Sequence, residues 1–270
     1  LPAAYGMFNG YIVGPGVDLT NANLTDADFT GFDLTGVDLS GANLSGTTLT
    51  GVTSGSITGT PTLPAAYGMF NGYIVGPGVD LTDVDLTGFD LSSTDLTGAT
   101  LTGVRSGGSI TGTPTLSAAY NLFNGYIVGP GVNLNGANLT DINLVDVDLR
   151  GADLKGVNLT NASLVGGDLR GVDLRGANLT GAVVRVANLE KVDLTGANLI
   201  GTDLSDSYIG EANLTNANLT DAILKNVGLN EADLSNAVLT GADLGNGTFF
   251  SFNLTGVTSG SITGTPTLLG

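Results

Sequence analysis

Residues 133–160 read NLNGANLTDINLVDVDLRGADLKGVNLT, with a large apolar side chain at every fifth position. The spacing continues without a gap to Leu254, which gives 25 five-residue units (pentads). A small apolar residue usually stands two places before each large one. A period of five is neither the 3.6 residues of a helix nor the alternation of a strand. The stretch therefore predicts a repeat architecture.

The composition excludes several kinds of chemistry. The 270 residues include no Cys and no His, and 25 Asp+Glu against 8 Lys+Arg give a net charge of −17. Thiol chemistry, an imidazole base and soft-metal clusters are thereby excluded, and no Ser has a recognisable base at a suitable spacing. We therefore expect no catalytic residue, no cofactor site and no metal site. The acidity also argues against direct binding to nucleic acid, and no apolar run is long enough to predict insertion in a membrane.

A second, longer repeat divides the chain into modules. Variants of LPAAYGMFNGYIVGPGV (the hairpin segment) stand at 1–17, 63–79 and 116–132, and the Asn-Gly at the centre of each predicts a β-hairpin. Seven, five and 25 pentads follow, and each array ends in a Gly/Ser/Thr-rich tail. A tail and the next hairpin segment together form a connector. The predicted modules are 1–62, 63–115 and 116–270.

The connectors could be flexible Gly/Pro/Ser linkers, since the pentad register restarts after each of them. However, they keep apolar residues such as Ile57, Tyr67 and Ile74, which a flexible linker does not need. The five pentads of the middle module are also too few to bury a core alone. We therefore expect ordered, irregular connector coils and one continuous solenoid.

The pentads resemble those of the pentapeptide-repeat proteins, as in VNLNGANLTDINL at 132–144 and GADLKGVNLT at 151–160. The resemblance covers the pentads and not the connectors. It implies an all-β fold, a right-handed quadrilateral β-helix with four pentads, about 20 residues, in each coil. It also implies that the central Leu and the preceding small residue point inward.

Recurrences at twenty residues support a four-sided coil independently, because residues twenty apart then stack on one face, about 4.8 Å from coil to coil. One predicted face carries Asn138, Asn158, Asn178, Asn198 and Asn218, with Thr140, Thr160, Thr180, Thr220 and Thr240 beside them and Ile200 as the interruption. Another carries Asp153, Asp173, Asp193 and Asp233.

These ladders are the candidate surfaces. The Asp ladder could bind a cation such as Ca²⁺, but the basic residues near the same coils favour a neutralised, solvated face. Those basic residues could instead form a small anion patch, although structural pairing with the Asp side chains is favoured. They are Arg150, Lys155, Arg170 and Arg175. The Asn/Thr face could order water for ice binding, but Asn and Thr recur throughout the motif.

The favoured function is structural: an extracellular or cell-surface rod or filament segment. The chain starts with one half of a connector and ends with the other. We therefore expect a fragment of a longer array, or chains that stack head to tail through 1–17 and 256–270.

The alternative, implied by the resemblance, is a cytoplasmic mimic of duplex DNA whose partner is a type II topoisomerase. Two features weaken it: the long connectors and the absence of a C-terminal amphipathic helix for dimerisation. An ice-binding or adhesive surface is the third function considered.

Overall fold

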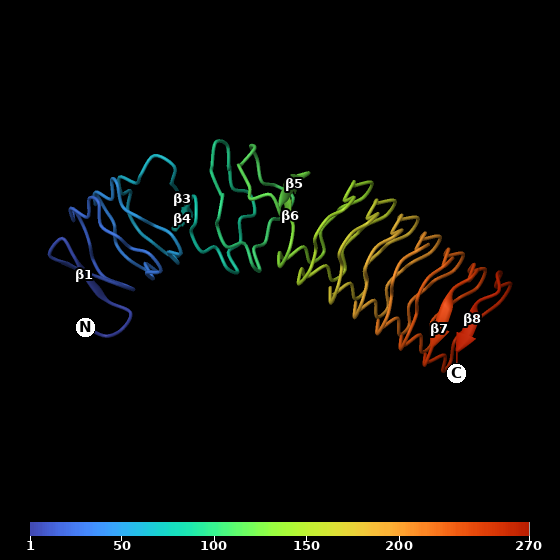
Figure 1. Ribbon diagram of the computed structural model, residues 1–270. Helices are drawn as coiled ribbons and strands as arrows, with labels where there is room; N and C mark the ends of the chain where they lie inside the picture. The colour runs from blue at the N-terminus through green and yellow to red at the C-terminus, as the bar shows by residue number, and fades with distance from the viewer. Residues whose placement is uncertain (270) are drawn as a thin grey trace. The chain divides into compact units, whose positions relative to one another are not determined.

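The computed structural model describes residues 1–269, and Gly270, which ends the predicted stacking segment 256–270, lies outside the described residues. The chain forms two compact units. The N-terminal unit consists of Leu1–Val104 and Ser109–Tyr120, and the C-terminal unit of Arg105–Gly108 and Asn121–Gly270. Each unit is a stack of coils (Figure 1). That the three predicted modules form one continuous solenoid stays a prediction.

Three short hairpins confirm the predicted Asn-Gly turns. The antiparallel pairs are β1 (Gly6–Phe8) with β2 (Tyr11–Val13), β3 (Gly68–Phe70) with β4 (Tyr73–Val75), and β5 (Asn121–Phe123) with β6 (Tyr126–Val128). Asn9 and Gly10 both have positive φ, 48° and 88°, as a two-residue hairpin turn requires. The parallel pair β7 (Thr248–Phe250) and β8 (Thr267–Leu269) closes the C-terminal unit.

The pentads form a right-handed quadrilateral β-helix, as predicted. Each face contributes single parallel bridges between residues twenty apart, for example Asn138 to Asn158 and Asn158 to Asn178. The inward Leu159 donates its N–H to the carbonyl of Asn178 at 2.7 Å, and Asn178 donates back to Val157 at 2.9 Å. The chain therefore pairs with the next coil on all four sides. No helix within residues 1–269 is long and apolar enough to span a bilayer.

The core lies inside the coils and is built from alternating large and small side chains. Leu154, Val157 and Leu159 are completely buried, as are most equivalent residues. Burial of one Leu stabilises by roughly 1.5–3 kcal/mol, while ordering the backbone costs about 1–2 kcal/mol per residue. A single coil cannot offset that cost with four Leu side chains, so stability depends on stacking.

The first connector is a wider, irregular coil within the N-terminal unit. Thr53 forms a parallel bridge with Asp80, which lies 27 residues later in the chain rather than 20. Gly51 donates its N–H to the carbonyl of Gly78, and Asp80 donates to that of Val52. The ladder therefore continues from the first pentad array into the second across residues 51–79.

Every corner of the coil needs a residue in the left-handed region. Gly, Asn and Asp fill most corners because they tolerate positive φ, as Asn216 does at 59°. Val186 occupies one corner at φ 56°, although β-branched residues are strongly disfavoured there. Its side chain is 61% exposed, so packing offsets little of this strain.

We expect Val186→Asn to stabilise the protein by about 1 kcal/mol, because it relieves this corner strain. Urea unfolding followed by circular dichroism measures the change. Asn216→Val at an equivalent exposed corner is the matched reverse substitution and should destabilise by a similar amount. Equal stability of Val186→Asn and the original chain would contradict the strain.

Candidate functional site

A two-residue polar motif covers the outer surface of the coils. In Asp18 and Thr20, the carboxylate oxygen Oδ1 accepts the backbone N–H of Thr20 at 2.9 Å and its hydroxyl at 2.6 Å. In other pentads Asn accepts the same two hydrogen bonds, as Asn158 Oδ1 does from the backbone N–H and the hydroxyl of Thr160. The Asp or Asn of a pentad and the Thr or Ser two residues later are thus hydrogen-bonded to each other. The Thr or Ser hydroxyl and backbone N–H both find their acceptor within the pair.

These hydrogen bonds stabilise the charged carboxylates. The hydroxyl of Ser40, followed by its backbone N–H, holds the pKa of Asp38 below the ordinary value of 3.8. The hydroxyl of Ser235 has the same effect on the pKa of Asp233. At Asp173, the largest contribution to the lowered pKa is the hydrogen bond from Arg175.

Because the pKa of these Asp side chains is lower in the folded state, their stabilising contribution is complete above about 3.8 and is lost as the pH falls through the folded pKa. We expect the urea concentration at the unfolding midpoint to stay constant between pH 7 and pH 5 and to decrease when the pH is lowered below 4. Asp28→Asn/Asp38→Asn should reduce this dependence, because Asn keeps the acceptor and does not titrate. A midpoint that rises on acidification would mean that charge repulsion outweighs the hydrogen bonds.

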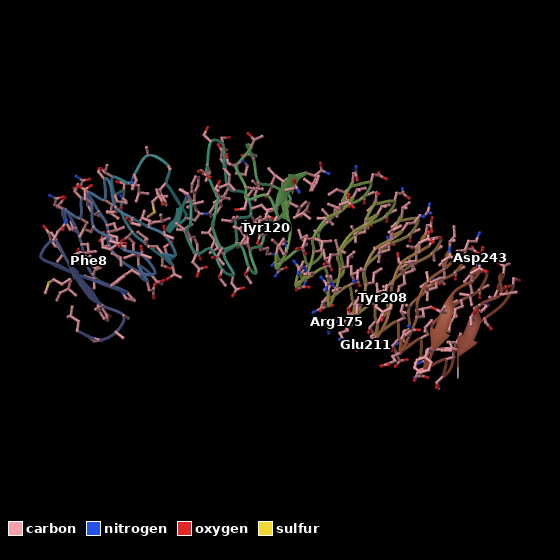
Figure 2. All side chains as sticks on the ribbon, in the orientation of Figure 1. Phe8, Tyr120, Arg175, Tyr208, Glu211 and Asp243 are labelled. Atoms are coloured by element: carbon pink, nitrogen blue, oxygen red, sulfur yellow. The ribbon has the colours of Figure 1, made fainter. Side chains whose placement is uncertain are left out.

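The predicted Asp ladder is present, and basic side chains lie within it. Asp153, Asp173 and Asp193 are bridged in successive coils. Arg175, which projects outward (Figure 2), pairs with Asp173 and lies 3.6 Å from Asp193. Lys155 Nζ lies 4.0 Å from Asp173. Residues 1–269 contain no group of three or more Asp or Glu side chains arranged to hold a metal ion.

The remaining predicted basic residues lie on a neighbouring face. Arg150 and Arg170 each donate Nε and Nη2 to the Asp two residues before, Asp148 and Asp168. Arg150 Nε also lies 3.5 Å from Asp168 in the next coil. The guanidinium groups are therefore engaged with carboxylates, which leaves little free positive charge for an anion.

The Asn/Thr face is an internally bonded network. Thr160 donates its hydroxyl to Asn158 at 2.6 Å and accepts Asn178 Nδ2 at 3.0 Å. The same pattern links Thr140 to Asn158 Nδ2 at 3.0 Å. The hydroxyl hydrogens thus point along the protein surface rather than toward water, which weakens the argument for ordered ice-like water on this face.

The connectors contain a side-chain contact that the sequence did not reveal. Ser54 Oγ accepts the backbone N–H of Ile74 at 3.0 Å, in the N-terminal unit. Within the C-terminal unit, Ser106 Oγ accepts the N–H of Ile127 at 2.8 Å. Both Ile side chains are fully buried. A Ser-Gly pair recurs near the start of each tail, and this recurrence is the sequence signal from which a conserved role of the Ser in the connector could have been predicted.

An apolar cavity of about 240 Å³ lies at the C-terminal end of the C-terminal unit. Inward Leu and Phe side chains of the last pentads line it, together with Val257, Ser259 and Ile262 of the last tail. It is the incompletely filled end of the solenoid core. Two further cavities, one beside Tyr126 and Asn133 and one beside Tyr67 and Ser92, have more polar linings.

Comparison with known proteins identifies the repeat. The family model described as pentapeptide repeats matches in eight copies that together cover more than half of the chain. The matched residues are 16–52, 78–105, 131–166, 152–190, 167–206, 187–226, 212–249 and 226–256. No curated protein matches the chain.

Solved structures of pentapeptide repeat proteins are also similar. HetL, involved in heterocyst differentiation regulation in the cyanobacterium Nostoc sp. strain PCC 7120, is 24% identical over 92% of this chain and 87% of that chain, with a TM-score of 0.37. Rfr23 from the cyanobacterium Cyanothece 51142 is 26% identical over 49% of this chain and 91% of that chain, with a TM-score of 0.27. QnrB1, a plasmid-mediated fluoroquinolone resistance protein, is 16% identical over 90% of each chain, with a TM-score of 0.28. On the extent of the family match, the chain belongs to the pentapeptide-repeat family.

Proposed function

We propose that this chain is a non-catalytic structural β-solenoid, a rod or filament segment that stacks end to end through residues 1–17 and 256–270. The observation that carries the proposal is the bridge from Thr53 to Asp80. It makes the connector 51–79 a hydrogen-bonded joint between pentad arrays. The same two half-connectors stand at the ends of the chain, with the tail 256–267 identical in sequence to 51–62.

The exposure of these ends supports stacking. Ile74, buried in the internal connector, corresponds to Ile12 of the first hairpin, which is 45% exposed. Ile57, 6% exposed, corresponds to Ile262 of the last tail, which is 38% exposed. Apolar groups that the internal connector covers are therefore open to solvent at both ends. Covering them would also protect the open edges of the coils, which otherwise invite uncontrolled pairing.

The symmetry and charge of the two ends favour a filament. The surfaces differ, so their contact is heterologous and extends indefinitely unless it closes into a ring. Residues 1–17 and 256–267 contain no Asp, Glu, Lys or Arg, although the chain carries a net charge of −17. Electrostatic repulsion between copies is therefore weakest where the ends would meet.

Electron microscopy and analytical ultracentrifugation of the purified chain test this function. We expect fibres one solenoid wide at high protein concentration, with a mass distribution that shifts upward with concentration. Raising the salt should favour longer assemblies, because it screens the net negative charge. A single monomeric species at every concentration and salt level would overturn the proposal.

Mimicry of duplex DNA is the second candidate, because the charges are unevenly distributed. All eight Lys and Arg residues lie in the C-terminal unit, whereas the N-terminal unit has ten Asp residues and no Lys or Arg. This unit thus presents carboxylates without cations, as a substitute for phosphates requires. A type II topoisomerase would be the partner and the cytoplasm the location, whereas the rod function suits an extracellular or cell-surface location.

A DNA-supercoiling assay with a type II topoisomerase tests the mimicry. If the second candidate is correct, the chain inhibits supercoiling. Asp18→Asn/Asp28→Asn/Asp38→Asn should then be weaker, although its fold is kept, because native Asn23 and Asn43 occupy equivalent positions. Equal inhibition by both proteins would argue against recognition of the carboxylates.

A further inference from the structure

We infer that the cavity beside the β3–β4 hairpin is a binding site for one neutral pyranose ring, such as the terminal sugar of a glycan. Its volume is about 170 Å³. The hairpin contributes residues 65–68 and Phe70 to the lining, and the second pentad array contributes residues 92–94. All of them belong to the N-terminal unit, so the cavity is internal to that unit. The inference is independent of the proposed end-to-end stacking.

An aromatic ring fills the corresponding space beside the first hairpin. When the two pentad arrays are aligned at their first Asp, Thr94 corresponds to Phe32. The ring of Phe32 packs edge-on against Phe8, with ring centroids 4.9 Å apart, and a Cβ on Gly6 would lie only 2.6 Å from Phe32 Cζ. At Gly68, the counterpart of Gly6, the three nearest atoms all belong to a phenylalanine of the hairpin itself. The replacement of a ring by the smaller Thr94 therefore accounts for the cavity.

Thr94 places a hydroxyl without a hydrogen-bond partner in the cavity. The residue is only 8% exposed, yet within residues 1–269 its Oγ1 makes no hydrogen bond. The similarly buried Thr47, by contrast, donates its hydroxyl to the carbonyl of Leu44 at 2.8 Å. No fully enclosed side-chain oxygen in the described residues lacks a partner, so Thr94 Oγ1 opens into the cavity that the residue lines. Because buried polar groups are generally hydrogen-bonded, a polar group of a ligand would complete this site.

Two aromatic rings in the lining are fixed by their neighbours. Phe70 stacks on Phe89, with ring centroids 5.6 Å apart and an angle of 22° between the ring planes. Tyr67 donates its hydroxyl to the carbonyl of Pro77 at 3.0 Å, and its ring lies so close to Gly76 that a Cβ has no room there. Both rings are therefore in position before a ligand arrives, which lowers the entropic cost of binding.

The lining favours a neutral ligand that has both hydroxyl groups and an apolar face. No lining residue carries a charge. Burial, and then the nearby charge of Asp95, raises the pKa of Tyr67, and the same negative charge disfavours an anionic ligand.

A pyranose has the required chemistry, because the C–H groups of its face can pack on an aromatic ring while its hydroxyls bond to the side chains of Ser93 and Thr94. The volume is below the roughly 300–1,000 Å³ of pockets for drug-sized ligands. The cavity therefore has room for one sugar ring rather than for an oligosaccharide.

Saturation-transfer difference NMR on the full chain tests the inference. The neutral probes are methyl β-D-glucopyranoside, methyl α-D-mannopyranoside, methyl β-D-galactopyranoside and N-acetylglucosamine. We expect at least one of them to bind with a dissociation constant of roughly 1 mM, since few contacts are available to a single ring. Glucuronate has a similar ring with a carboxylate and should bind roughly fivefold to tenfold more weakly than the best neutral probe, because of the charge of Asp95.

Substitutions of Thr94 separate the cavity from the hydroxyl. Thr94→Phe restores the ring that stands beside the first hairpin and should abolish binding, because it fills the cavity. Thr102→Phe makes the same change at an exposed position of the same unit, outside the lining, and should bind like the original chain. Thr94→Val keeps the size and should weaken binding about threefold to tenfold, the effect of one net hydrogen bond. Its melting temperature should not fall, since the hydroxyl bonds to nothing within residues 1–269.

Three results would overturn the inference. One is that none of the four neutral sugars binds. Another is that the Thr94→Phe variant, shown to be folded by circular dichroism, binds a sugar as well as the original chain does. The third is that benzyl alcohol, a ring without the hydroxyls of a sugar, binds more tightly than every sugar. Because the assay needs no association between copies, its outcome is separate from that of the proposed stacking.

Discussion

The hydrogen bonds between successive coils are the constraint on which the structure depends. On each face the inward Leu donates its N–H to the next coil, and that coil donates back, as Leu159, Asn178 and Val157 illustrate. A pentad has no such partner within itself, because four corners separate it from the position directly above. Local propensity therefore contributes little, and each coil is ordered by the coils beside it.

This dependence explains how the surface is built. The side chains that face outward cannot add to the core. They form hydrogen bonds with one another instead, as Thr20 does with Asp18. The few cations of the C-terminal unit are used in the same way, with Arg150, Arg170 and Arg175 paired to the Asp two residues before. Hydrogen bonds and ion pairs therefore engage many of the outward-facing polar side chains, while the surface as a whole stays acidic, with a net charge of −17 for the chain.

The ends of the stack are where the same constraint stays unmet. Inside the N-terminal unit, the connector 51–79 changes the spacing of the bridges yet keeps the coils hydrogen-bonded. At the open ends the corresponding Ile12, Leu254 and Ile262 are exposed. A repeat protein usually needs caps at such positions.

The sequence by itself determined the coil. The Leu every fifth residue, the recurrence of Asn and Thr every twentieth and the Asn-Gly turns are local or periodic signals, and they predicted a repeat architecture with four-sided coils and the three hairpins. The resemblance of the pentads to the pentapeptide-repeat family implied the β-helix. Tertiary structure alone decided which side chains meet across a connector, because Ser54 and Ile74 are separated by an irregular loop with no fixed period. It also placed the cavity beside Ser259 and left Ile12 exposed, since burial depends on what lies above a coil. A repeating sequence specifies the repeat well and its ends poorly, because the ends differ from the interior only in their neighbours.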